Sequence, residues 1–273
     1  MHPVLFHIGG VQGYSYGFMI AVGAILAIFV SEWRARRRGL DGDLVFKAAL
    51  WGLFAGLVGA KLTFLLSNYR LLLTDPKTAL GSDGFTVIGG VILGILAGVW
   101  IVHRAGAPKL LLMDLVIPQI ALAQGFGRIG CFLAGCCYGK PTDHALGVVF
   151  PPEAIAPSGI SLWPTQLFSA AGNFLIFAIL LLLSNVATAH LRLPGRPGED
   201  RSKALLKPGS ISAMYLILYG IGRFLIEFLR DDPRRMALGF TSNQIVCIGL
   251  VFLGAFLVAF AQKKGTTFGQ SDK

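Results

Sequence analysis

The sequence predicts an all-α polytopic membrane protein with seven transmembrane helices, its N-terminus outside and its C-terminus in the cytoplasm. Of its 273 residues, 54% are hydrophobic and 14% are charged, whereas about 25% of the residues in a soluble domain are charged. A helix that crosses a bilayer needs about 20 predominantly apolar residues. Seven runs of about this length occur, at 15–33, 44–66, 86–104, 110–130, 166–189, 209–229 and 242–262.

The runs differ in ways that indicate how the helices begin and pack. The first 15 residues lack the basic start and the small-residue cleavage site of a signal peptide, so the first run should remain as a helix. The second and third runs contain the stretches WGLFAGLVGAKL and GGVILGILAG, and small residues let membrane helices pack closely. No polar segment is long enough for an added soluble domain, so we expect one integral membrane domain over 1–273.

Basic residues set the predicted orientation, because the cytoplasmic loops of membrane proteins are enriched in lysine and arginine. One set of alternate loops, which includes Arg36, Arg37 and Arg38 after the first run, holds most of the loop lysines and arginines. These loops explain the net charge of +10, which therefore does not indicate a nucleic-acid partner. We expect an extracytoplasmic loop at 131–165 and a cytoplasmic linker at 190–208.

Two arginines lie where the predicted helices should cross the membrane. Arg128 follows the apolar run 110–123 in QGFGRIGCFLAGCCYG, and Arg223 lies in YGIGRFLIEFLR. A charge at the bilayer centre costs at least about 3 kcal/mol by insertion scales and usually marks a substrate path. Two cations at this depth suggest an anionic substrate in the membrane, such as a phospholipid headgroup, because the arginine fork matches a pair of phosphate oxygens. The alternative for Arg128 is snorkelling to the interface beside a helix end.

Other polar residues on the predicted helices have both a structural and a functional interpretation. Glu227 is four residues after Arg223 and shares its helix face, so the two can form a local ion pair, and Arg230 lies one further turn along. Lys61 is a third cation at membrane depth, where snorkelling or pairing with Glu227 is an alternative to substrate binding. Tyr16, at the outer end of the first helix, fits an interfacial aromatic belt as well as a site.

Three of the four cysteines, Cys131, Cys136 and Cys137, fall in the predicted outer loop, which faces an oxidising compartment in many bacteria. A disulfide from Cys131 to either Cys136 or Cys137 fits this compartment. The C-x4-C-C spacing differs from that of the usual metal sites and no histidine pair is near, so we expect no metal. Cys247, inside the seventh predicted helix, is expected to pack in the core.

These segments resemble the prolipoprotein diacylglyceryl transferase family. GRIGCFLAGCCYG (127–139) is similar to the family's glycine-rich signature G-R-x-G-N-F-x-N-x-E-x-x-G. Four more segments agree in the same order along the chain: SYGF (15–18) with W-Y-G-L, GAKLTFLL (59–66) with G-A-R-x-x-Y-V-L, WPTQLF (163–168) with H-P-S/T-Q-L-Y-E, and YGIGRFLIEFLR (219–230) with Y-G-x-x-R-F-x-x-E-x-x-R. The resemblance covers nearly the whole chain, and the family shares the seven-helix, N-outside topology.

The resemblance implies an enzyme of the bacterial cytoplasmic (inner) membrane that transfers a diacylglyceryl group from phosphatidylglycerol to the cysteine thiol of a prolipoprotein, with glycerol phosphate as the leaving group. The implied partners are phosphatidylglycerol, prolipoprotein signal peptides and membrane lipids, with no metal or cofactor. In this scheme Arg128 and Arg223 clamp the headgroup phosphate. Glu227 orients Arg223, and Tyr16 shapes the pocket. The residues implied in substrate binding are Gly127, Gly130, Lys61, Gln166 and Arg230.

The chain departs from the family pattern mainly at positions that would handle protons. The arginines of the pattern are kept at Arg128, Arg223 and Arg230, and Lys61 replaces a further one. Asparagine, glutamate, histidine or tyrosine of the pattern is replaced at Ile88, Cys131, Ala134, Cys136, Trp163, Phe168 and Ser169. Three other functions therefore stay open: transfer of a lipid group to another acceptor, phospholipid binding without catalysis, and thiol–disulfide exchange by the cysteines. A changed product would identify transfer to another acceptor, and lipid binding without turnover would identify a non-catalytic protein. Loss of function on cysteine-to-serine replacement would identify thiol–disulfide exchange.

Overall fold

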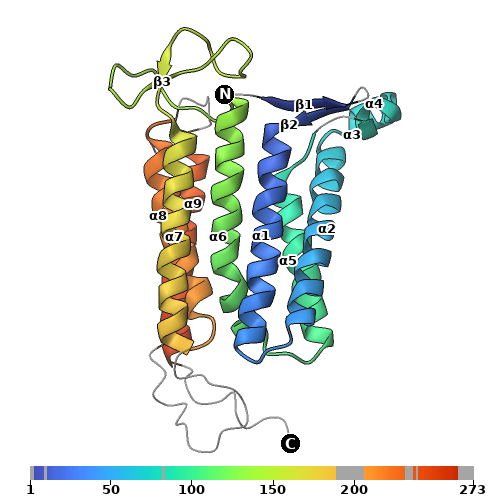
Figure 1. The fold of residues 1–273 in the computed structure, drawn as a ribbon, viewed down its shortest axis with the longest axis vertical. Helices are drawn as coiled ribbons and strands as arrows, with labels where there is room; N and C mark the ends of the chain where they lie inside the picture. Colours follow the sequence, from blue (N-terminus) through green and yellow to red (C-terminus); the bar gives the residue numbers. More distant parts are fainter. Residues whose placement is uncertain are drawn as a thin grey trace, which may run out of the picture. The chain divides into compact units, whose positions relative to one another are not determined.

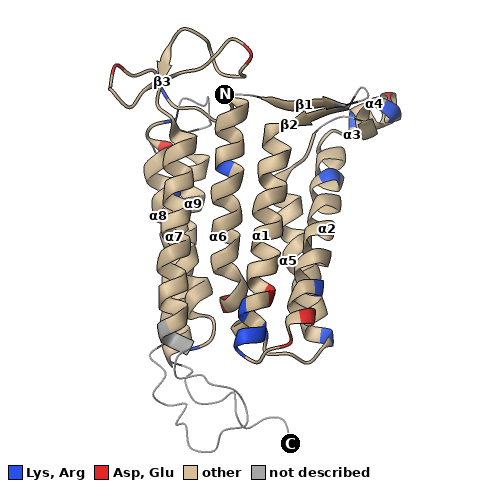
Figure 2. Cartoon of the chain, in the orientation of Figure 1, with Lys and Arg blue, Asp and Glu red and all other residues tan. Residues whose placement is uncertain are grey.

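Long helices make up most of the chain (Figure 1). The computed structural model describes residues 3–8, 11–81, 84–188, 206–230, 236–237 and 239–263. Within these ranges seven helices are long and apolar enough to cross a membrane, which confirms the predicted fold class. They are α1 Ser15–Arg37, α2 Gly42–Ser67, α5 Val87–Arg104, α6 Lys109–Ala134, α7 Thr165–Thr188, α8 Ser210–Glu227 and α9 Ser242–Lys263. Long stretches of these helices contain no charged residue (Figure 2).

Short elements occupy the connections between the long helices. Two short helices, α3 Tyr69–Thr74 and α4 Pro76–Gly81, follow α2. Three antiparallel strand pairs complete the described structure: β1 Val4–Ile8 with β2 Val11–Tyr14, β3 Val148–Val149 with β4 Ser161–Leu162, and β5 Met236–Ala237 with β6 Phe240–Thr241. The N-terminal hairpin, in which Val4 pairs with Tyr14, was not predicted from the sequence.

Two boundaries differ from the predicted ones in ways that matter for the site. Helix α6 continues to Ala134, so Cys131 lies on the helix and the connection that follows begins at Gly135. Helix α8 ends at Glu227, so Arg230 lies beyond it rather than one turn further along the same helix. The stretch predicted as a cytoplasmic linker, 190–208, lies outside the described residues except for 206–208.

The chain divides into two compact units, one made of Met1–Ala27 and Met113–Lys273 and the other of Ile28–Leu112. In the smaller unit, α2 and α5 pack along their glycines. A Cβ atom added to Gly56 would lie 3.2 Å from the carbonyl oxygen of Gly90, and one added to Gly59 would lie 2.5 Å from that of Gly89. The backbones are therefore too close for larger residues, which confirms the predicted glycine packing.

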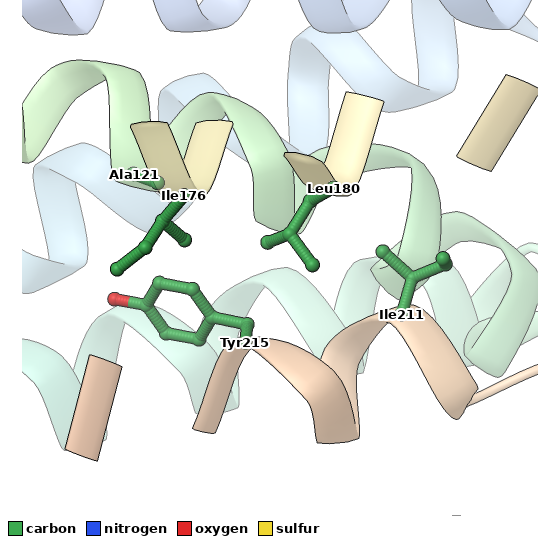
Figure 3. Packing of buried hydrophobic residues seen from close by; sticks show 5 residues of the cluster. All are labelled: Ala121, Ile176, Leu180, Ile211 and Tyr215. Atoms are coloured by element: carbon green, nitrogen blue, oxygen red, sulfur yellow. The ribbon is translucent and has the colours of Figure 1, made fainter. Parts of the chain in front are cut away.

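The larger unit has an apolar core to which three helices contribute (Figure 3). Ala121 comes from α6, Ile176 and Leu180 from α7, and Ile211 and Tyr215 from α8. Leu180 and Ala121 are fully buried. The core fixes α6 against α7 and α8, the helices that also carry the arginines and the residues around them.

A second, smaller core lies in the connection between α6 and α7, the segment expected from the sequence to be an extracytoplasmic loop. Phe150, Ala156 and Leu162 are buried there, and Phe132 of α6 and Tyr138 pack against them. The β3–β4 pair lies in the same segment. This packing anchors the connection to the end of α6.

Asp114 of α6 caps a different helix from its own. It lies near the start of α6, but its carboxylate accepts hydrogen bonds from the backbone N–H groups of Gly209 and Ser212, at 2.6 and 2.8 Å, where α8 begins. It also accepts one from the Ser212 hydroxyl at 2.7 Å. The carboxylate satisfies donors that the first turn of a helix leaves unpaired, and its negative charge favours that end.

Removing this cap should weaken the packing of α8 without touching the arginines. We expect Asp114→Ala to destabilise the protein by about 2 kcal/mol, because a cap and charged hydrogen bonds are lost together. That corresponds to a fall in the melting temperature in detergent of about 5 °C. Thermal unfolding followed by tryptophan fluorescence measures it, with Glu153→Ala, an exposed loop carboxylate, as the control. Equal melting temperatures for the two variants would contradict the capping role.

Candidate active site

Arg128 lies on α6, six residues before the helix ends, and its side chain is half-buried. No described residue accepts a hydrogen bond from its guanidinium or forms an ion pair with it. Removing a charge from water without a counter-ion costs free energy. A half-buried arginine in this situation favours an anionic ligand over a purely structural role.

The glycines on either side of Arg128 have different surroundings. A Cβ atom added to Gly127 would meet nothing closer than Ile20 Cγ1 at 4.0 Å, so this face of α6 is open. A Cβ atom added to Gly130 would lie 3.1 Å from the Tyr16 carbonyl oxygen and 3.1 Å from Met19 Cβ. Gly130 therefore lets the end of α6 approach the start of α1, while Gly127 leaves space beside the arginine.

Arg223 and Glu227 form the ion pair that their spacing on α8 predicts. Arg223 Nη2 lies 3.1 Å from Glu227 Oε2, and the two side chains are 13% and 2% exposed. Glu227 Oε1 also accepts hydrogen bonds from Thr241 Oγ1 at 3.1 Å and from Asn243 Nδ2 at 3.4 Å. The carboxylate thus holds Arg223 and ties the end of α8 to the start of α9.

Arg230 connects the end of α8 to the segment after α6. It is 8% exposed, and its Nη1 donates a hydrogen bond to the Cys137 carbonyl oxygen at 3.4 Å. The backbone N–H of Lys140 donates to the Leu229 carbonyl at 2.8 Å beside it. Because α8 stops at Glu227, Arg230 faces the cysteine segment instead of continuing the stripe of Arg223.

The three predicted arginines, Arg128, Arg223 and Arg230, all belong to the larger unit. Arg223 lies within electrostatic range of Arg128 and Arg230 as well as Glu227. Tyr16, whose side chain is 44% exposed, lies within electrostatic range of Arg128. Three guanidinium groups with one carboxylate among them create a positive region that attracts a phosphate group.

The first turn of α7 supports the segment after α6 through two side chains. Thr165 Oγ1 donates to the Cys137 carbonyl oxygen at 2.8 Å, and Gln166 Nε2 donates to that of Cys136 at 2.8 Å. Gln166 is 1% exposed, and its Oε1 has no hydrogen-bond partner among the described residues. This oxygen is an acceptor in place for a donor that the described chain does not supply, such as a substrate hydroxyl.

Cys131, Cys136 and Cys137 come together, with sulfur atoms all within 4.8 Å of one another. Either disulfide expected from the sequence requires Cys131 to meet one of the other two, whereas the meeting of all three thiols was not predicted. The end of α6 brings them together. Gly135, at φ +73°, follows the helix, its N–H bonds to the Phe132 carbonyl at 3.1 Å, and the Cys136 N–H bonds to that of Cys131 at 3.0 Å. This is a Schellman motif, which places the residue after the glycine over the last full turn. A C-x4-C spacing across such a helix end therefore pairs the two side chains.

All four cysteines are free, and neither of the two disulfides considered from the sequence is formed. Cys137 is the one non-glycine residue of the described chain with a positive φ, +63°. Hydrogen bonds from Cys131 and Cys136 lower the pKa of the Cys137 thiol, and the nearby Arg230 guanidinium lowers it further. Hydrogen bonding to the same neighbours and burial raise the pKa of Cys136.

Lys61 belongs to the smaller unit. It lies on α2, half-buried, with its Nζ over the rings of Phe64 and Phe85 at 5.4 and 5.3 Å. Such cation–π contacts stabilise an ammonium group that is partly removed from water. Its part in substrate binding stays a prediction.

Comparison with known proteins identifies the family. The family model for prolipoprotein diacylglyceryl transferase matches residues 3–260. The phosphatidylglycerol–prolipoprotein diacylglyceryl transferase of Clostridium tetani is 37% identical over 259 residues, which cover 94% of this chain and 96% of the relative. The phosphatidylglycerol–prolipoprotein diacylglyceryl transferase 2 of Clostridium perfringens is 36% identical over 267 residues, which cover 97% of each chain. A match of this extent across the long helices and both arginines shows that the chain belongs to the prolipoprotein diacylglyceryl transferase family.

Proposed function

We propose that the protein transfers a diacylglyceryl group from phosphatidylglycerol to the cysteine thiol of a prolipoprotein. The observation that carries the proposal is Arg128, a half-buried arginine that no described residue neutralises. It lies beside the open face of Gly127 and within electrostatic range of Arg223. A phospholipid phosphate supplies the charge that this region lacks.

The reaction replaces a carbon–oxygen bond with a carbon–sulfur bond. The acceptor sulfur attacks the glyceryl carbon next to the phosphate, and the oxygen departs with the electron pair as part of glycerol phosphate. Negative charge grows on the phosphate as that bond breaks. Arginine donors that are already aimed at the phosphate stabilise the transition state more than the ground state, and this difference is what accelerates the reaction.

The other site residues support this clamp in distinct ways. Arg128 and Arg223 bind the phosphate, Glu227 holds Arg223 in place, and Tyr16 borders the site as a catalytic residue. Substrate binding is assigned to Gly127, which leaves room for the headgroup, and to Gln166, whose buried Oε1 can accept from a glycerol hydroxyl. The same role is proposed for Gly130, Lys61 and Arg230.

The substrates also define where the protein works. Seven apolar helices make it a multi-pass membrane protein, and the basic loops of the sequence favour an outside N-terminus and a cytoplasmic C-terminus. We place it in the bacterial cytoplasmic membrane, where the signal peptide of a prolipoprotein presents its cysteine at the outer surface. Both substrates then reach the arginines from within the membrane.

The test is an assay of the purified protein in detergent with phosphatidylglycerol and a peptide that contains a lipobox cysteine. Mass spectrometry should show a peptide that has gained one diacylglyceryl group, together with an equal amount of glycerol phosphate. A peptide with serine in place of cysteine is the control and should stay unmodified. Consumption of lipid without modification of the peptide would indicate another acceptor. The replacement of the family's histidine by Ile88 and of its glutamate by Ser169 favours this alternative. Lipid binding without any turnover would indicate a non-catalytic protein.

A further inference from the structure

The three clustered thiols lie as close together in space as the ligands of one metal ion, although their spacing along the sequence is unusual for a metal site. Their sulfur atoms all lie within 4.8 Å of one another, with Cys131 buried and the other two half-buried. A tetrahedral zinc ion with Zn–S bonds of about 2.3 Å holds its sulfur ligands about 3.8 Å apart. Small side-chain rotations therefore bring three thiolates around one ion. A disulfide would use only two of these sulfurs and leave the third unexplained.

The backbone that presents the thiols is held firmly. Cys137 adopts a positive φ, a conformation that is strained for a non-glycine residue and persists only where its surroundings enforce it. Thr165 and Arg230 both donate to the Cys137 carbonyl, and Gln166 donates to that of Cys136. Strain held in this way is typical of functional sites.

We propose that Cys131, Cys136 and Cys137 bind one Zn²⁺ ion as thiolates, and that the fourth position of the ion receives the thiol of the acceptor cysteine. Three protein ligands with one open position are the pattern of catalytic zinc, whereas structural sites are closed by a fourth ligand. The assignment of the open position rests on the proposed transferase function. The binding of zinc by the three thiolates does not depend on it.

The ion would solve a problem that the described side chains leave open. The acceptor thiol must lose its proton before it attacks, because the thiolate is the nucleophile. Glu227, the carboxylate among the arginines, already accepts from Arg223, Thr241 and Asn243. A zinc ion removes the need for a separate base, since a thiol that coordinates a metal is deprotonated.

The step is balanced without a change of oxidation state. On coordination the acceptor S–H releases its proton to water. The metal-bound sulfur attacks the glyceryl carbon, the C–S bond forms as the C–O bond breaks, and the electron pair leaves on glycerol phosphate, which takes up a proton. The thioether product has lost the thiolate charge and binds zinc weakly, so it can leave the ion.

Metal content tests the site directly. The protein is purified in detergent on a tag that does not bind metal, and its elements are measured by mass spectrometry. We expect about one zinc per chain, lost in Cys131→Ser, Cys136→Ser and Cys137→Ser and retained in Cys247→Ser, the fourth free cysteine. Folding of each variant is checked by size-exclusion chromatography. A wild-type protein that contains no zinc, holds copper instead, or oxidises the cluster to a disulfide overturns the proposal.

The open position is tested with cobalt(II), which occupies thiolate sites and absorbs light through sulfur-to-metal charge transfer. Adding the cysteine-containing lipobox peptide should intensify this band, and the serine peptide should leave it unchanged. Chelation should lower transfer by about 10-fold or more, and Zn²⁺ should restore it while Mg²⁺ should not. Zinc bound without any peptide transfer would leave the site standing and refute the transferase function. Full transfer by metal-free protein would support the transferase function and refute the role of the ion in activating the acceptor thiol.

Discussion

Replacing Arg128 with alanine is expected to lower kcat/KM for diacylglyceryl transfer by about 100- to 1,000-fold, the effect of removing one donor aimed at a developing charge. The loss should appear mainly in kcat, because the guanidinium gains most when the phosphate becomes the leaving group. Arg128→Lys keeps the charge but not the two-pronged donor geometry, so its activity should lie between those of alanine and wild type. The assay with saturating phosphatidylglycerol measures all three.

The same substitution should leave stability unchanged or raise it. Arg128 is half-buried, has no described counter-ion, and lies within electrostatic range of Arg223. Removing a charge of this kind relieves repulsion and desolvation. Arg104→Ala, at the exposed end of α5, serves as the control and should retain activity. If Arg128→Ala turned over at the wild-type rate, or lost activity only because it unfolded, the phosphate clamp would be wrong.

The long helices could be predicted from the sequence because the length and apolarity of a span are local properties. The bilayer requires each helix to satisfy its own backbone, so a run of about 20 apolar residues is nearly sufficient evidence for one. Features that depend on another part of the chain could not be predicted in this way. Asp114 caps α8 from α6, and nothing near position 114 in the sequence indicates which helix start it meets.

The site was predictable to the extent that helix periodicity governs it. Arg223 and Glu227 are four residues apart on one helix, and the ion pair follows from that spacing. Contact of Cys131 with Cys136 or Cys137 was predicted as a disulfide, but the clustering of all three thiols was missed because C-x4-C-C differs from the usual spacing of metal ligands. The available signal was Gly135, a glycine directly after an apolar helix, which predicts a Schellman motif and with it the contact between Cys131 and Cys136.

Glu227→Gln is expected to reduce both stability and activity, in contrast to Arg128→Ala. The substitution leaves Arg223, 13% exposed, without the carboxylate that lies 3.1 Å away. Breaking a buried ion pair by removing one partner costs about 3–5 kcal/mol, because the remaining charge stays buried. The glutamine can still accept from Thr241, so the packing of α9 is kept and the change isolates the charge. Thermal unfolding in detergent measures the loss, with Glu32→Gln, which breaks the exposed pair with Arg36, as a control that should change little.

A double variant then separates the two roles of the pair. Arg223→Met combined with Glu227→Met removes both charges, and a buried pair replaced by apolar residues of similar volume is often neutral or stabilising. We expect the melting temperature to return toward that of the wild type while transfer stays lost, since Arg223 no longer holds the phosphate. Recovery of activity together with stability would show that the pair only supports the fold. Loss of activity in a stable double variant would show that the Arg223–Glu227 pair serves the reaction and does more than support the fold.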